Sequence, residues 1–175
     1  MNVLDGRWTV DVDDEHFVVF IIGAKVRNPF RALRALPLLG EMNKMLADLS
    51  KDPDKGLLAY QRHGGPFGVI VQYWRSFDAL EAFARNTEDR HAQVWRQWFR
   101  KAQHQNPAVG IWHETYTVQS YEAIYQNMPA IGLGKAGHVR PVNKRSESAR
   151  ERAGLSVPAQ AGAPNEEQPE SATTE

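Results

Sequence analysis

Residues 73–86 read YWRSFDALEAFARN, and within this stretch the pattern of the chain changes from strand to helix. The preceding residues 67–72 (FGVIVQ) are rich in branched and aromatic side chains, as is typical of a strand. Ser76 is a suitable N-cap, and Asp78 places an acid in the first helical turn. Trp74 and Arg75 therefore stand at a strand-to-helix junction. This junction is either an ordinary turn of the fold or the wall of a ligand chamber.

Outward from this junction, strand and helix patterns alternate along the chain. Residues 16–26 (HFVVFIIGAKV) are apolar on both faces, which predicts a strand covered on both sides. The predicted elements are, in chain order, a strand at 16–26, a helix at about 30–49 interrupted at Pro37, strands at 56–63 and 67–75 joined by a glycine-rich link, a helix from 77 that pauses at 85–86 and restarts after 89, and a strand at 108–118.

The order strand, helix, strand, strand, helix, strand is that of the ferredoxin-like α+β fold. In this fold an antiparallel four-stranded sheet carries both helices on one face. The other face would be bare, although the strand at 16–26 is apolar on both sides. A second copy of the same sheet is the simplest cover. The sequence therefore predicts a homodimer, arranged as a dimeric α+β barrel.

Composition limits the class of protein. The 175 residues, 42% of them apolar, fit one domain. Lys plus Arg and Asp plus Glu both number 21, so no net charge draws the chain to nucleic acid or anionic lipid. There is no cysteine, no basic segment ahead of an apolar one at the start, and no apolar run long enough to span a bilayer. We expect a cytoplasmic protein without nucleic-acid or membrane partners.

A compositional boundary falls near residue 138. Residues 138–175 contain no aromatic side chain and are rich in Ser, Pro, Ala, Glu and Arg, so they bury too little apolar surface to fold. The predicted division is an ordered domain at 1–137, with a C-terminal extension from about 119, and a disordered tail at 138–175.

Four blocks of sequence resemble known proteins. They are YWRSFDALEAFAR (73–85), the pair His91 and Trp95, VGIWHETY (109–116) and YEAIYQNMPAIGLG (121–134). A strand ending in Trp-x-Ser that continues into Phe-x-x-Leu-x-x-Phe resembles the dimeric α+β barrel superfamily of antibiotic-biosynthesis monooxygenases and haem-degrading oxygenases. The four blocks together are similar to a family named after a fumagillin-pathway monooxygenase. The resemblance covers about residues 15–137 and implies a substrate held between sheet and helices.

Candidate catalytic residues come from the junction and from the second helix. Trp74 and Arg75 are either a core plug and a surface arginine or two groups of a chamber wall, where Arg75 would meet an anionic or carbonyl group. His91, Trp95 and Trp98 share one helical face. His91 is either a hydrogen-bonded core residue or a general base or haem ligand. Trp95 and Trp98 are candidate substrate-binding residues.

The last predicted strand separates its functional groups onto two faces. His113 shares a face with Thr115, whereas Glu114 and Tyr116 share the other. One face should meet the cavity and the other the partner subunit. His113 and Tyr116 are candidate catalytic residues, and Glu114 is a candidate binding residue. Position 117 is Thr117, so the string is not the His-Glu-x-x-His zinc motif, and we expect no metal site.

Tyr121 and Tyr125 stand four residues apart in YEAIYQNMP. The spacing predicts a short helical turn before Pro129. The turn either packs the C-terminal extension onto the domain or closes the cavity as a lid, in which case both tyrosines would contact substrate.

Three functions follow as hypotheses. The first is a small monooxygenase that needs no cofactor and acts on an apolar or aromatic molecule, with an imidazole as base. The second is a haem-binding protein or haem enzyme on the same barrel, with His91 or His113 as the iron ligand. The third is a dimer that binds a small ligand without catalysis.

Overall fold

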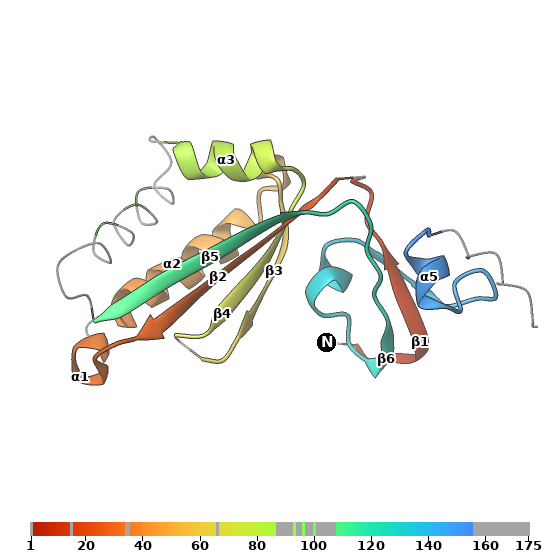
Figure 1. The fold of residues 1–175 in the computed structure, drawn as a ribbon, viewed down its shortest axis with the longest axis horizontal. Coiled ribbons are helices and arrows are strands. Elements are labelled where there is room, and N and C mark those ends of the chain that lie inside the picture. The colour runs from red at the N-terminus through yellow and green to blue at the C-terminus, as the bar shows by residue number, and fades with distance from the viewer. Residues whose placement is uncertain are drawn as a thin grey trace, which may run out of the picture.

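The structure is a computed structural model that describes residues 2–14, 16–33, 36–65, 67–86, 93, 96, 100 and 108–155. These residues form two antiparallel sheets, one of four strands and one of three, which lie toward opposite ends of the long axis in Figure 1. The α+β class predicted from the sequence is confirmed. His91, Trp95 and Trp98 lie outside the described residues.

The four-stranded sheet has the strand order β3-β4-β2-β5. Its strands are β2 (Val18–Val26), β3 (Leu57–His63), β4 (Val69–Trp74) and β5 (Val109–Thr117). The helices α1 (Pro29–Ala32) and α2 (Leu36–Leu49) and the 3-10 turn η2 (Pro53–Lys55) connect β2 to β3, and α3 (Phe77–Arg85) follows β4. The predicted order of strands and helices is therefore present between residues 18 and 117.

The break in the first helix falls earlier than the sequence suggests. Pro37 is the second residue of α2 rather than an interruption inside it. Proline is tolerated in the first turn of a helix because the backbone N–H that it lacks would have no intrahelical partner there. The interruption separates α1 from α2 instead.

One face of this sheet carries the core. The buried side chains Val18, Phe20 and Ile22 alternate along β2 and pack with residues of α2 and α3. The helical members of this cluster are Met42, Met45, Leu46, Leu49 and Phe83. Both helices therefore cover the same face of the sheet, as the sequence predicts.

The three-stranded sheet was not predicted. It consists of β1 (Leu4–Asp11), β6 (Tyr125–Met128) and β7 (His138–Pro141), in the order β6-β1-β7. Residues 7–12 (RWTVDV) do alternate between polar and apolar side chains, which is a strand signal. By contrast, β6 and β7 have four residues each and gain their order from pairing with β1.

Two predictions about the C-terminal part are wrong. Tyr125 begins β6, so it does not form a helical turn with Tyr121. The tail predicted from residue 138 contains β7 and the short helix α5 (Ala149–Arg152), and the described order continues to residue 155. Composition fails here because backbone pairing and polar contacts, rather than aromatic burial, hold this segment.

Polar contacts fix α5 to the rest of the chain. Arg152 Nε donates to Glu122 Oε1 at 2.7 Å, and the Arg152 side chain is almost fully buried. Ser148 and Glu151 form a capping box at the start of α5. The hydroxyl of buried Ser146 accepts a hydrogen bond from Asn143 N at 3.0 Å.

The 3-10 turn η3 (Gly132–Lys135) joins the two sheets. Lys135 Nζ donates to Gln61 Oε1 of β3 at 3.2 Å, and Tyr125 lies buried against Gly134. A Cβ on Gly134 would lie 2.8 Å from the Tyr125 ring, so only glycine allows this close approach. The turn covers part of the sheet face opposite the helices.

Truncation tests the corrected boundary. Ending the chain after Gly137 removes the strand paired with β1 and the Arg152 to Glu122 ion pair. We expect the free energy of unfolding to fall by about 2–4 kcal/mol, because backbone hydrogen bonds and a part-buried ion pair are lost. Ending the chain after Leu155 removes none of these contacts and serves as the control in thermal or urea unfolding. Equal stability of the two truncated chains would contradict the boundary at 155.

Tyr125 gives the protein a dependence on alkaline pH. Burial raises the pKa of Tyr125 above its usual value of 10.0, and its hydroxyl donates to Ile131 O at 3.1 Å. The stabilisation is complete below pH 10 and is lost as the pH rises through the elevated pKa of the folded state. Urea unfolding between pH 9 and 11 should show this loss, with a shallower decline for Tyr125→Phe. Parallel declines in the two proteins would mean that ionisation of Tyr125 does not control it.

Candidate functional site

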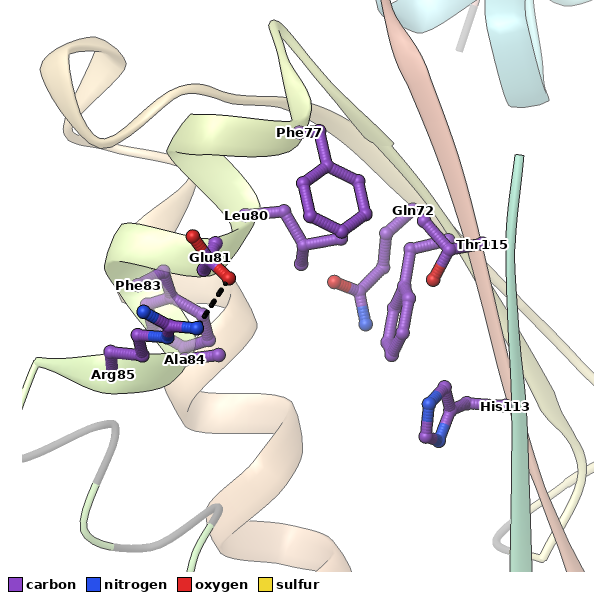
Figure 2. Close-up of a pocket in the computed structure, with 10 residues that line it drawn as sticks. Gln72, Phe77, Leu80, Glu81, Phe83, Ala84, Arg85, His113 and Thr115 are labelled. Carbon is purple, nitrogen blue, oxygen red and sulfur yellow. Dashed lines mark ion pairs between the residues drawn. The ribbon is translucent and has the colours of Figure 1, made fainter. Parts of the chain in front are cut away.

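A cavity of about 300 Å³ lies between the four-stranded sheet and α3. Figure 2 shows α3 on one side and the strands on the other, with side chains of both directed into the space between them. A ligand pocket typically has this size and a mostly apolar lining. The sequence resemblance implies a substrate at this place, between sheet and helices.

The apolar wall of the cavity comes mainly from α3. Phe77, Leu80, Phe83 and Ala84 line it, and Phe20 of β2 faces them from the sheet. The helix starts where the sequence predicts, because the hydroxyl of Ser76 accepts a hydrogen bond from Ala79 N at 3.1 Å. The N-cap thus sets which residues of α3 face the sheet.

Three polar side chains of the sheet face this wall. Gln72 of β4 and Thr115 of β5 each pair with Phe20, so the three form one row across adjacent strands. His113 follows on the same face of β5, with its ring 5.5 Å from that of Phe20 between centroids. The predicted alternation of β5 is confirmed, and its His113 face is the one that meets the cavity.

A hydrogen bond from Trp74 holds the side chain of Gln72 in place. The indole Nε1 of Trp74 donates to Gln72 Oε1 at 3.0 Å, and the Trp74 ring packs against Phe83 with 5.3 Å between centroids. Trp74 is 0% exposed and Gln72 2%. Gln72 Nε2 has no hydrogen-bond partner among the described residues. The amide projects from the sheet toward the cavity (Figure 2).

The end of α3 adds an ion pair to the rim of the cavity. Arg85 Nη2 lies 2.8 Å from Glu81 Oε1, one turn earlier in the helix. Both side chains are exposed, so the pair contributes little to stability. It gives an otherwise apolar opening a polar edge (Figure 2).

Arg75 does not join this site. Its Nη2 donates to Pro53 O at 3.0 Å, and its backbone N–H donates to Gly56 O at 2.8 Å. Both bonds attach the start of α3 to the segment around η2. The described lining includes Gln72 and Phe83, which touch Trp74, but neither Trp74 nor Arg75. The junction is therefore an anchored turn, and Trp74 contacts the lining residues Gln72 and Phe83 without lining the cavity itself.

Glu114 and Tyr116 lie on the opposite face of the sheet from His113. The Tyr116 hydroxyl donates to Glu114 Oε2 at 2.6 Å, and this bond raises the pKa of Tyr116. The neighbouring Trp112 ring lies over Gly23, where a Cβ would come within 2.6 Å of it. The structure thus does not bring these two candidates together with His113.

Tyr121 and Tyr125 act as packing anchors in the structure. The Tyr121 hydroxyl accepts a hydrogen bond from Val12 N at 2.7 Å, and its ring meets Phe17 edge-on, with centroids 5.2 Å apart. Tyr125 is buried beneath η3. Neither belongs to the described lining of the cavity. Of the alternatives left open by the sequence, the geometry favours the anchor over the lid.

The sequence patterns did not indicate Gln72, Thr115 or the apolar residues of α3 as residues of the site. The available signal for Gln72 was its position: it is the one polar residue of VIVQYW (69–74), and it stands two residues before Trp74 on the same face. A polar side chain on a core-facing position of a strand needs a partner, which marks it for attention.

Other kinds of site receive no support from the described residues. They contain no group of three or more His, Cys, Asp or Glu side chains that could hold a metal ion. None of their helices is long and apolar enough to cross a membrane. A second hollow lies along the edge strand β3, next to Arg62 and Lys135, but it is wide open and polar.

Solved structures share the fold at low identity. Two aldoxime dehydratase structures, one in complex with butyraldoxime, match with TM-scores of 0.55 and 0.54 and 17% identity, over 85% of this chain and 43% of theirs. A possible oxidoreductase of unknown function from Bacteroides thetaiotaomicron matches at 14% identity over 60% of this chain and 99% of its own, with a TM-score of 0.40. This chain spans less than half the length of the aldoxime dehydratases, and the likeness shows the fold alone.

No curated protein matches the sequence. One protein family does: Monooxygenase af470-like, over residues 17–133. The match spans more than half of the chain and contains every described residue of the cavity lining. The narrower link to a fumagillin-pathway enzyme stays a prediction. The chain belongs to the Monooxygenase af470-like family.

Proposed function

We propose that this protein is a small monooxygenase that binds an apolar or aromatic molecule in the cavity between the sheet and α3. The observation that carries the proposal is the imidazole of His113 in a lining whose other described residues present a largely apolar surface. Membership of a monooxygenase-like family supports oxygen chemistry. An imidazole exchanges protons near neutral pH, which suits a general base.

The reaction that fits these groups needs no cofactor. His113 takes a proton from a CH₂ group beside a carbonyl, and the resulting carbanion supplies electrons to O₂. The peroxide that forms on carbon loses water and leaves a second carbonyl, so that R₂CH₂ and O₂ become R₂C=O and H₂O. The apolar wall of α3 shields one side of the carbanion from bulk water.

A haem protein is the second candidate. His113 is of the right type, because a histidine holds the iron in globins and peroxidases. A bound haem would supply the oxygen or redox chemistry in place of a proton-transfer route. The iron ligand would then be His113, which would no longer act as a base, or His91.

We also propose that the protein acts as a homodimer through the sheet face opposite the helices. Trp112 and Tyr116 are 39% and 50% exposed on this face, next to the half-buried Val19 and Ile21 of the central strand β2. The turn η3 covers this face on the side of β3 and β4, where it contacts Gln61 and Tyr73. A second copy would bury the apolar residues on the β2 and β5 side.

Oxygen uptake tests the catalytic proposal. With a panel of aryl-CH₂-carbonyl compounds such as 2-indanone, the protein should consume one O₂ for each dicarbonyl formed. His113→Gln should lower kcat by about 10²- to 10⁴-fold, the usual contribution of a positioned base. His63→Gln, an exposed histidine of β3 outside the described lining, is the control. His91→Gln in the same series shows whether the second imidazole takes part.

Each result selects among the hypotheses. Unchanged turnover in His113→Gln would reject His113 as the base. Binding of the panel without any oxygen uptake would support the non-catalytic dimer. We expect no Soret band from protein expressed with haem supplied; a band that His113→Ala removes would establish the haem alternative instead.

Light scattering tests the dimer. The wild-type protein should have the mass of two chains at micromolar concentration, and Trp112→Glu should have the mass of one, because it places a charge in the proposed apolar contact. Phe30→Glu changes another exposed aromatic residue, on α1 rather than on the sheet, and should remain dimeric. A wild-type monomer at micromolar concentration would contradict the proposal.

A further inference from the structure

We propose that Gln72 orients the ligand: its buried amide donates a hydrogen bond to a neutral oxygen acceptor, such as a ketone, on an otherwise apolar ring system. The inference rests on the part of the proposed function that places the ligand in this cavity, and it does not depend on turnover. It defines the class of substrate more narrowly than the apolar lining alone does.

The orientation of the amide follows from its partner. An indole N–H is a donor only, so the Gln72 atom 3.0 Å from Trp74 Nε1 must be the carbonyl oxygen. The amide NH₂ then lies on the other side of the group. A flip of the amide would set two donors against each other. Trp74 thus acts as a positioning residue.

The NH₂ group lacks a partner although its surroundings are closed. Gln72 is 2% exposed, and its Nε2 makes no hydrogen bond to any described residue. Native proteins seldom leave a buried donor unsatisfied, and an exception often marks a place where a ligand completes the bonding. Because Gln72 also belongs to the cavity lining, a ligand in the cavity can supply the acceptor.

The neighbouring groups indicate what surrounds this acceptor. Phe20 pairs with Gln72 on one side and Thr115 on the other, so an aromatic floor separates two polar edges. Leu80 and Phe83 cover the floor from α3. A flat ring system fits between these apolar side chains, with its oxygen at the Gln72 edge.

The charges of the lining favour a neutral acceptor over a carboxylate. The guanidinium of Arg85 is paired with Glu81 at 2.8 Å, and that of Arg75, which the sequence suggested for an oxygen-rich end, is bonded to Pro53 O. The buried donor that faces the cavity is the uncharged amide of Gln72. At the Gln72 edge a carboxylate would lose its hydration and meet an amide rather than a cation.

A pair of probes measures the contribution of the amide. The ring systems of 1-indanone and indane match except for the carbonyl. Their dissociation constants are measured by ligand-observed NMR under nitrogen, so that no oxidation occurs. In wild-type protein the ketone should bind about tenfold more tightly than the hydrocarbon, as expected for one hydrogen bond.

Two variants separate the roles in this bond. Gln72→Met keeps the length of the side chain but removes the amide, and the tenfold preference should disappear while indane still binds, which shows that the cavity is intact. Trp74→Phe should reduce the preference, because the amide is then free to turn. Thr117→Ser on β5, outside the described lining, should leave it unchanged.

Several results would overturn the inference. The first two are a preference for the ketone that persists in Gln72→Met, and the absence of any preference in the wild-type protein, which would result if a tightly held water occupied the amide. The others are tighter binding of indane-1-carboxylate than of the ketone, and no binding of either probe. Absence of oxygen uptake with the ketone preference intact would refute the monooxygenase and leave the role of Gln72 standing.

Discussion

The hydrogen bond from the Trp74 indole to Gln72 connects the core of the fold to the wall of its cavity. Trp74 stands in register with Val18 of β2 and Leu57 of β3, and its ring meets Phe83 of α3, so three elements of the core meet at one side chain. Its N–H must find an acceptor inside this core. Gln72, two residues earlier on the same face, is that acceptor. Because the buried indole N–H of Trp74 needs the carbonyl oxygen of Gln72, the NH₂ group of Gln72 is left at the cavity.

Because side chains alternate along a strand, the two faces of the four-stranded sheet have different roles. Along β5, His113 faces the cavity, whereas Trp112 faces away and rests on Gly23 of β2. The same alternation gives β2 one face for the core and one for the proposed dimer contact. Because the two faces share a backbone but no side chain, dimer formation and ligand binding make separate demands on the sequence.

The parts of the fold that could be predicted are those with local or periodic signals. Ser76 and the apolar spacing after it located α3, and branched residues located the strands of the larger sheet. The smaller sheet escaped because β6 and β7 are too short to show a period and depend on pairing with β1, more than a hundred residues away in sequence. The spacing of Tyr121 and Tyr125 fits a helical turn, but Tyr125 lies in β6, whose conformation depends on pairing with β1. Local pattern could not reveal the strand partner that overrides it.

The unpaired donor of Gln72 could not be predicted for a different reason, which also bears on the chemistry. Its type and position are visible in the sequence, but its lack of a partner is a property of the folded environment. An uncharged donor suits the proposed reaction, because a neutral ketone gains negative charge on its oxygen as His113 removes the proton. A hydrogen bond to that oxygen strengthens as the charge develops, and more so because the amide that donates it is buried. A fixed cation would bind a carboxylate in the ground state more strongly and so favour other ligands. In the proposed function, holding the amide in place before the ligand arrives is therefore the step by which the core, through Trp74, would contribute to the selection of substrate.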